Sequence, residues 1–183
     1  MDSEKALIQG CIKGDRKAQK QLYDQFAGRM LVVAMRYSKS DLEAEDIIQE
    51  AFIKIFEKIK TFREESRLGF WIKRIVVNTA LNHQRSKLYM FPMVDVQELN
   101  NNSDGDFSLS NYHFKELLAF IKELPSGCQI IFNLYAIEGY SHQEIAKMLD
   151  ISIGTSKSQY FRAKELLKAR IGQEEQKSYE RVR

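Results

Sequence analysis

The chain has 183 residues, of which 44% are hydrophobic and 29% are charged, a composition typical of a soluble folded protein. Its 28 basic residues exceed the 25 acidic ones by only three, so the net charge alone says little about nucleic-acid binding. Two distant cysteines and three histidines without ligand-like spacing argue against a disulfide framework and a zinc site. We therefore expect no metal, no cofactor and no catalytic residue.

No segment has the length and apolarity of a signal peptide or a membrane span, so we expect a cytoplasmic protein that does not insert into a membrane. Charge is nevertheless segregated along the chain. Residues 41–50 hold five acids and no base, whereas residues 66–94 hold five bases and no acid. Such segregation indicates separate surfaces with different partners.

Apolar residues recur at helical spacing, and only two prolines and nine glycines interrupt them, so we predict an all-α protein. The clearest break is residues 91–111, where a proline, an Asn run, an Asp-Gly pair and four acids without a base favour a flexible linker. The sequence thus predicts two small helical domains, residues 1–90 and 112–183, joined by this linker.

In the first domain, Asp15 is placed to cap a helix that continues to about Tyr37. The next helix, residues 44–59, follows the i, i+3, i+4 rule of an amphipathic helix without a miss. A second face of this helix carries Asp46, Gln49, Glu50 and Ile53. This acidic face is either a docking site for a basic protein surface or a solvated face with one stray isoleucine.

Residues 70–86 form a further predicted helix with a polar and aromatic line opposite its apolar face. At spacings of 3, 4, 4 and 3 this line contains Trp71, Arg74, Asn78, Asn82 and Arg85. Guanidinium groups bind phosphates, amides read base edges and an indole stacks on bases. In the preceding loop, with Phe62 and Arg63, an aromatic could line a pocket for an unstacked base. Equally, Trp71 could be half-buried among ordinary surface residues.

The second domain contains a predicted helix-turn-helix. Pro125 starts a helix that Gly139 ends, and Ser141 with Glu144 forms a capping box for a short helix. After three or four linking residues a longer helix begins near Thr155. In a helix-turn-helix the second helix enters the major groove of DNA.

On this second helix we expect an inward and an outward face. The inward face would contain Tyr160, Ala163, Leu166 and Leu167, and the outward face would contain Lys157, Ser158, Phe161, Arg162 and Lys164. Residues 157–183 hold eight bases and four acids, which is moderate support for phosphate contact. A helical hairpin without a nucleic-acid partner would show the same pattern.

Three segments together resemble one family: DLEAEDIIQEAFIKIFEKIKTF, FWIKRIVVNTALNHQR and EGYSHQEIAKMLDISIGTSKSQYFRAKELL. They are similar, in this order, to conserved regions two and four of bacterial sigma-70-type factors of the small extracytoplasmic-function (ECF) group. The resemblance implies a region 2-like bundle for core polymerase binding, −10 recognition and melting. It also implies a region 4-like helix-turn-helix domain for −35 recognition, and an anti-sigma factor as a further partner.

The resemblance also implies roles for individual residues. The chain would contact core RNA polymerase at its beta-prime clamp and at its beta flap. The residues that bind the beta-prime clamp would be Asp46, Gln49, Glu50 and Ile53. The −10 element would be held by Phe62, Arg63, Trp71, Arg74, Asn78, Asn82 and Arg85. The −35 element would meet Thr155, Lys157, Ser158, Phe161, Arg162 and Lys164.

Four positions depart from the family pattern. The family often has an acid near Asn82, a glycine at Asp150, a valine at Ser156 and an arginine at Gln159. The leading function is a sigma factor that is not an enzyme by itself; the alternative is a stand-alone helix-turn-helix regulator with the first domain as a sensor. Enzymes are a third class, but the sequence has no phosphate loop and no Ser-His-Asp arrangement.

Overall fold

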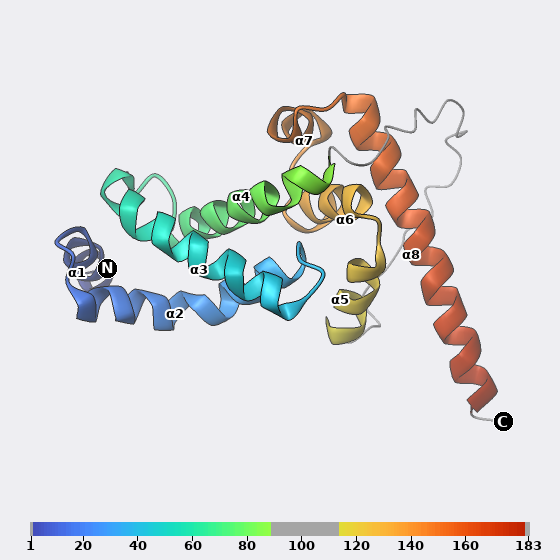
Figure 1. Ribbon diagram of the computed structural model, residues 1–183, viewed down its shortest axis with the longest axis horizontal. Helices are drawn as coiled ribbons and strands as arrows, with labels where there is room; N and C mark the ends of the chain where they lie inside the picture. The colour runs from blue at the N-terminus through green and yellow to red at the C-terminus, as the bar shows by residue number, and fades with distance from the viewer. Residues whose placement is uncertain (1, 89–113, 182–183) are drawn as a thin grey trace. The chain divides into compact units, whose positions relative to one another are not determined.

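The computed structural model describes residues 2–88 and 114–181, and within these ranges it contains helices and no strand (Figure 1). The chain separates into two compact units, the first of which ends at Arg85. The prediction of an all-α protein with two helical domains is confirmed. The predicted linker, residues 91–111, lies outside the described residues.

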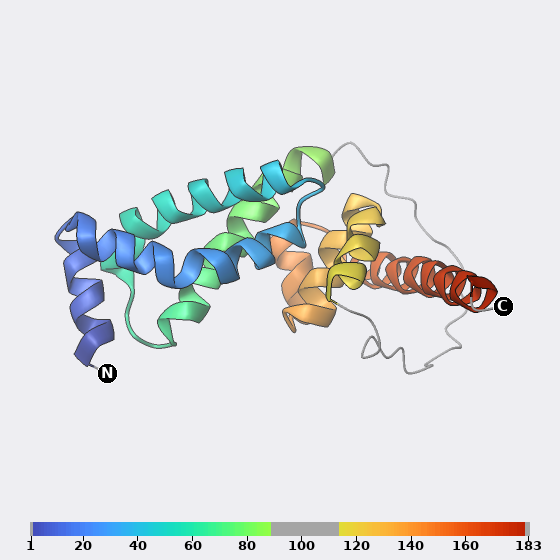
Figure 2. The same cartoon turned by 90° about the horizontal axis from the view of Figure 1, so that it is seen from below.

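The first unit contains α1 (Asp2–Ile12), α2 (Arg16–Met35), α3 (Asp41–Lys58), the short 3-10 helix η1 (Ile59–Thr61) and α4 (Leu68–Leu88). The helices α2 and α3 lie side by side in Figures 1 and 2. Side chains that are at most 5% exposed line their interior; they include Leu22, Phe26, Ile47, Ile48, Ala51, Ile55, Ile72, Val76 and Ala80. The amphipathic pattern read from the sequence therefore gives the core of this unit.

Local hydrogen bonds set where the helices of this unit begin. The Asp15 carboxylate accepts the backbone N–H of Lys17 at 2.7 Å, which confirms the predicted cap of α2. At the start of α3, the Ser40 hydroxyl accepts the N–H of Glu43 at 3.2 Å, and the Glu43 carboxylate accepts the N–H of Lys39 at 2.8 Å. These caps satisfy N–H groups that have no partner within their helix.

A buried glutamine on α4 contacts both the segment after α2 and the first turn of α3. The Gln84 amide donates to the Tyr37 carbonyl and to the Glu43 carboxylate, each at 2.9 Å. Because a buried amide without partners costs free energy, these two bonds favour one position of α4. They thereby set which residues of α4 face outward.

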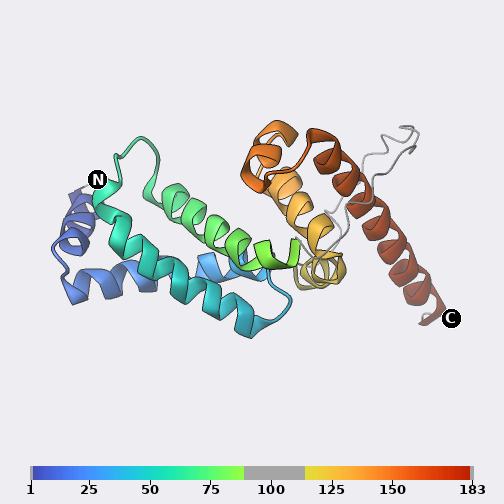
Figure 3. The ribbon, with the colours of Figure 1, turned by 45° about the horizontal axis from the view of Figure 1, so that its top comes forward.

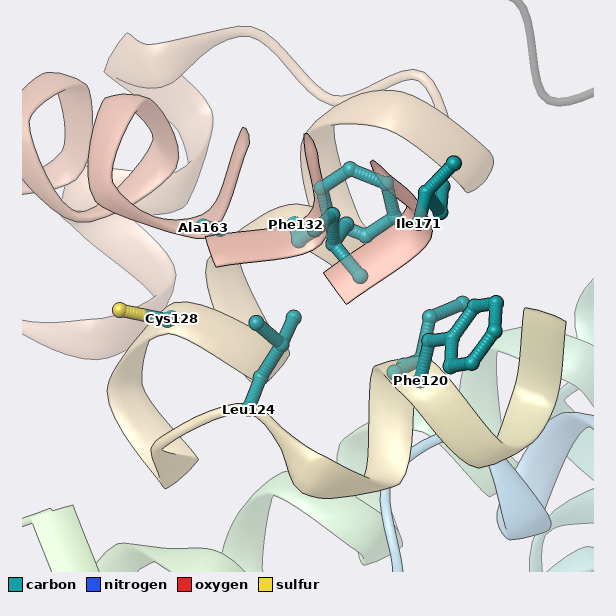
Figure 4. Packing of buried hydrophobic residues seen from close by; sticks show 8 residues of the cluster. Phe120, Leu124, Cys128, Phe132, Ala163 and Ile171 are labelled. Atoms are coloured by element: carbon teal, nitrogen blue, oxygen red, sulfur yellow. The ribbon is translucent and has the colours of Figure 1, made fainter. Parts of the chain in front are cut away.

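The second unit contains α5 (Phe114–Glu123), α6 (Ser126–Phe132), the π-helical segment η2 (Asn133–Ile137), α7 (His142–Leu149) and α8 (Ile153–Arg181). Figure 3 shows α7 and the start of α8. Figure 4 shows its core, formed where α5, α6 and α8 meet. The core consists of Phe120, Ile121, Leu124, Cys128, Phe132, Ala163, Leu167 and Ile171. The long helix α8 thus packs against α5 and α6 through this apolar core.

Two details of α8 differ from the sequence prediction. The helix begins at Ile153 rather than near Thr155, because the Ser152 hydroxyl accepts the N–H of Thr155 at 2.9 Å and caps it. Leu166 was expected to face the core but is 39% exposed. The buried residues of α8 follow at intervals of four, at Ala163, Leu167 and Ile171, so that the core stripe passes to one side of Leu166.

Candidate functional site

The outward face of α3 presents acidic, amide and apolar groups together. Asp46 and Gln49 are exposed, and Ile53 is 59% exposed despite being aliphatic. Leu42, four residues before Asp46, is 69% exposed and extends this face into a stripe of Leu42, Asp46, Gln49 and Ile53. The sequence reading missed Leu42, although extending the stripe by one turn toward the N-terminus would have found it. Exposed aliphatic side chains beside a carboxylate suit a protein partner better than plain solvent.

Glu50 differs from its neighbours on α3, because its carboxylate is engaged within the unit. One oxygen accepts a hydrogen bond from the Lys54 ammonium at 2.5 Å, and the other lies 2.5 Å from Nε2 of His83 on α4. These hydrogen bonds, first Lys54 and then His83, lower the pKa of Glu50 below its usual 4.5. Glu50 therefore links α3 to α4 at the edge of the exposed stripe.

On α4 the predicted polar line is solvent-accessible over most of its length. Arg74, Asn78 and Asn82 are exposed, and Arg63 in the preceding loop is exposed as well. The side chain of Arg85, which was expected to complete the line, lies outside the described side chains. On α4 one guanidinium group and two amides are thus exposed at helical spacing, with chemistry suited to a nucleic acid.

The two aromatic residues expected near this line contact each other. Trp71 is half-buried, and its ring centroid lies 5.4 Å from that of Phe62 with the planes tilted by 52°. This contact fixes the loop before α4 against its first turn. The predicted pocket-lining Phe62 is therefore held by the indole, and part of the indole surface is used for that purpose.

The turn of the helix-turn-helix has the predicted cap and one strained residue. The Ser141 hydroxyl accepts the N–H of Glu144 at 3.3 Å, and the Glu144 carboxylate accepts the N–H of Ser141 at 2.8 Å, which confirms the capping box. The backbone N–H of Ser141, and then its hydroxyl, donate hydrogen bonds to the Glu144 carboxylate and lower the pKa of Glu144. Asp150 ends α7 with φ 55°, in the left-handed region where glycine is favoured.

A polar pair holds α7 against the start of α8. Ser156 is fully buried, and its hydroxyl lies 2.8 Å from Nδ1 of His142. The Tyr135 ring stacks on His142 with centroids 4.2 Å apart and planes at 15°. Burial, and secondarily the charge of Lys157, lowers the pKa of His142 below 6.5. The valine-to-serine departure noted at Ser156 is thus matched by a hydrogen-bonding partner.

The outward face of α8 contains the predicted basic groups. Lys157 and Arg162 are exposed, while the other four predicted contacts are half-buried, namely Thr155, Ser158, Phe161 and Lys164. The Lys164 ammonium lies 5.4 Å from the centre of the Tyr160 ring, over its face. Gln159 instead points inward, where its side-chain oxygen accepts from the Cys128 thiol at 3.0 Å.

An open pocket of about 650 Å³ adjoins this face; among its lining residues are Tyr135, Tyr140, Ser141, His142 and Lys157. Among the residues that the structure describes, no group of three His, Cys, Asp or Glu side chains is placed to hold a metal ion. Within the same ranges no helix combines the length and apolarity needed to cross a membrane.

A capped helix-turn-helix, accompanied by a second helical unit with an exposed guanidinium and amide face, defines a helical DNA-binding protein. Residues 22–88 match the family model described as Sigma-70 region 2, and residues 114–167 match the one described as Sigma-70, region 4. Together these segments cover more than half of the chain. The chain belongs to the sigma-70 family.

Curated relatives assign the chain to the ECF group of this family. The ECF RNA polymerase sigma-E factor of Haemophilus influenzae is 30% identical over 182 residues, which cover 92% of this chain and 95% of that protein. The factor of the same name from Escherichia coli K12 is 29% identical over 181 residues, covering 92% and 94%. The fold is shared with the sigma factor RpoE in its complex with the anti-sigma factor NepR from Bartonella quintana, at a TM-score of 0.51, 21% identity and coverage of 82% and 94%.

Proposed function

We propose that this chain is a cytoplasmic ECF-type sigma factor that directs core RNA polymerase to promoters with −10 and −35 elements and assists DNA melting. The observation that carries the proposal is the presence of regions 2 and 4 in one chain, together with an exposed acidic stripe on α3. The activity consists of binding, so it requires neither a cofactor nor a catalytic residue of this chain.

In this proposal the stripe on α3 binds the beta-prime clamp of core polymerase, and the predicted C-terminal domain, residues 112–183, contacts the beta flap. The exposed carboxylate of Asp46 and the exposed amide of Gln49 suit a basic partner surface. Leu42 and Ile53 would supply apolar contacts at either end of the stripe. Glu50 would contribute through its position at the edge, where Lys54 and His83 orient its carboxylate.

The predicted N-terminal domain, residues 1–90, would hold the −10 element in its single-stranded form. Trapping unpaired bases by stacking and hydrogen bonds shifts the melting equilibrium without any bond chemistry. Exposed guanidinium and amide groups on α4 and the contact between Phe62 and Trp71 support this assignment. The proposed −10 contacts are Phe62, Arg63, Trp71, Arg74, Asn78, Asn82 and Arg85.

The start of α8 would read the −35 element in the major groove, as the second helix of a helix-turn-helix does. The capped turn and the exposed Lys157 and Arg162 support this role. Since phosphate contacts release counterions, affinity should fall with rising salt. The proposed −35 contacts are Thr155, Lys157, Ser158, Phe161, Arg162 and Lys164.

We further propose an anti-sigma factor as a partner. The structurally similar RpoE of Bartonella quintana was solved with the anti-sigma factor NepR, and the two units here each present exposed faces that such a protein could cover. Co-purification from the native host at endogenous levels should recover a small protein besides polymerase. Repeated recovery of polymerase alone would contradict this part of the proposal.

The decisive experiment reconstitutes the chain with core polymerase and measures promoter-dependent transcription. Asp46→Lys should lower affinity for core polymerase by roughly 10-fold or more, because it places a cation where a basic surface is expected to dock. Glu4→Lys, a charge reversal at an exposed position of α1, is the matched control and should change affinity far less.

No transcript from the wild-type complex on any genomic fragment would reject the proposal. Tight binding to duplex operator DNA without polymerase, unaffected by Asp46→Lys, would instead support a stand-alone helix-turn-helix regulator.

A further inference from the structure

The loop that connects η1 to α4, residues 62–67, contains a residue with a strained backbone. Glu64 has φ 57°, in the left-handed region that glycine adopts without a steric penalty. Among the described residues that are not glycine, Asp150 in the turn of the helix-turn-helix is the other with a positive φ. A strained residue persists only where surrounding contacts hold it, and such residues gather at functional sites. The contacts of this loop therefore bear on its function.

The two ends of the loop are fixed by the elements that it joins. The N–H of Phe62 donates to the Ile59 carbonyl at 3.1 Å, and Leu68, the first residue of α4, is buried. Residues 63–66, between these ends, are exposed to solvent. Contacts from outside the loop therefore decide how firmly its middle is held.

Lys5 of α1 supplies such a contact to the strained residue. Its ammonium lies 3.7 Å from the Glu64 carboxylate, and the two side chains are 59% and 55% exposed. An exposed ion pair of this kind contributes little to overall stability. It can nevertheless bias a short loop, because a small difference in free energy is enough to shift the populations of two loop conformations.

The helix that carries Lys5 is itself firmly packed. Leu7 and Ile8 are buried, and a Cβ atom added at Gly10 would lie 2.6 Å from the Cβ atom of Ala18 on α2. Such a close approach leaves α1 little room to move against α2. Since α1 also packs against η1, which leads into the loop, Lys5 extends toward the loop from a fixed backbone.

The pair also changes the charge that the loop presents. Arg63 and Arg67 can bind phosphates, whereas Glu64 and Glu65 would repel them. The Lys5 ammonium offsets the charge of Glu64 and draws its carboxylate toward α1. A nucleic acid that approaches the loop therefore meets less negative charge.

We propose that Lys5 and Glu64 are positioning residues that hold residues 62–67 in the conformation that receives an unpaired base of the −10 element. This inference rests on the proposed sigma function and adds α1 to it. The helix α1 lies outside residues 22–88, the segment that matches Sigma-70 region 2. Both side chains act through the loop rather than by touching the DNA, so that their loss lowers selectivity among bases more than overall affinity.

The test uses the full chain bound to core polymerase and promoter fragments whose −10 segment is pre-opened. The promoter is chosen by mapping transcript starts after overexpression. Selectivity is the ratio of the affinities for the preferred base and for another base, at the −10 position where wild type discriminates most. Lys5→Glu and Glu64→Lys should each lower this ratio by about 2- to 5-fold, since each replaces an exposed ion pair by two like charges. The double variant restores the pair with its charges exchanged, so its ratio should return to about that of wild type.

Two further variants separate positioning from stability. Lys13→Glu, the same charge change at an exposed position just after α1, is the matched control and should leave the ratio unchanged. Glu64→Gly relieves the backbone strain but removes the pair. Urea unfolding followed by Trp71 fluorescence should therefore show little change in stability for Glu64→Gly, while its ratio falls.

Three outcomes would count against these roles. Unchanged ratios in both single charge reversals, or a double variant as unselective as the single ones, would overturn the inference. A ratio that falls only in parallel with stability would show that the pair acts through folding alone, which also overturns it. Failure of the wild-type complex to bind any pre-opened fragment would instead reject the proposed function, and the inference with it.

Discussion

At the scale of single residues, two titratable side chains each have at least one partner that sequence spacing does not reveal. Glu50 is paired with Lys54 on its own helix and with His83 from α4. His142 is stacked on Tyr135 and bonded to Ser156. The shifted pKa of each group makes the stability of its unit depend on pH, with a sign that follows from the direction of the shift.

Glu50→Gln should lower the free energy of unfolding of the first unit at pH 7 by less than about 1 kcal/mol, because partly exposed ion pairs are screened by water. The folded-state pKa of Glu50 lies below 4.5, so its contribution is present above pH 4.5 and is lost as the pH falls below that value. Urea unfolding followed by tryptophan fluorescence should therefore show the gap between wild type and variant closing on acidification. Glu45→Gln, at an exposed position of the same helix, should show little gap at either pH.

His142→Gln should flatten the pH dependence of the second unit between about pH 8 and pH 5.5. The folded state lowers the pKa of His142 from 6.5, so protons bind the unfolded chain preferentially and wild-type stability falls as the pH drops through 6.5. Amide hydrogen exchange in peptides from α7 and α8 measures this directly. His83→Gln, in the first unit, is the control and should leave that exchange unchanged; an equal pH response in His142→Gln would contradict the assignment.

At the scale of helices, the residues at the helix termini determine where each helix begins and ends. Asp15 and the Ser141–Glu144 box act as predicted because caps depend only on residues within a few positions. Asp150 is the exception, since it occupies the left-handed region without being glycine. A Cβ atom in this backbone conformation is sterically unfavourable, and the packing of the α7–α8 turn must offset that cost in free energy.

Asp150→Gly should stabilise the second unit by up to about 1 kcal/mol, because glycine adopts φ 55° without a Cβ clash. Part of this gain is offset by the greater freedom of glycine in the unfolded chain. Asp150→Ala retains the clash and loses a side chain that tolerates this conformation, so it should be less stable than wild type. Thermal unfolding of the three proteins by circular dichroism gives the order; Ala above Gly would be the contrary result.

The helices and their inward faces could be predicted because each depends on periodicity within one segment. The same helical periodicity predicted the stripe on α3 and the polar line on α4. Asp46, Gln49, Arg74, Asn78 and Asn82 are exposed, as that periodicity predicts. The contacts of Gln84, His83 and Gln159 could not be predicted, because each joins residues more than 30 positions apart. Leu166 was misplaced for a related reason, since only the packing of α5 and α6 decides which edge of α8 is covered.

At the scale of the whole molecule, two units with separate cores should respond separately to damage. The chain has one tryptophan, Trp71, and it lies in the first unit. Its fluorescence therefore reports on that unit, whereas circular dichroism reports on the helices of both. This division lets a single protein sample distinguish the two unfolding transitions.

Leu167→Ala should destabilise the second unit by about 2–5 kcal/mol, because Leu167 is fully buried in the core shown in Figure 4. The transition seen by circular dichroism should shift to lower temperature, while the tryptophan transition stays in place. The adjacent Leu166→Ala removes the same atoms from an exposed position and should change stability by less than about 0.5 kcal/mol. A shift of the tryptophan transition by Leu167→Ala would show that the units unfold together.

The continuity of α8 has a consequence for how promoter preference can change over time. One uninterrupted helix carries the exposed Lys157 and Arg162, which we propose contact DNA, and the core residues Ala163, Leu167 and Ile171. Each residue inserted between these two sets would rotate one against the other by about 100°. Substitutions on the outer face of α8 can therefore change without disturbing the core. An insertion or deletion within α8 would instead rotate the outer face relative to the core residues. New promoter preferences in this chain should thus arise by replacement of side chains at constant helix length.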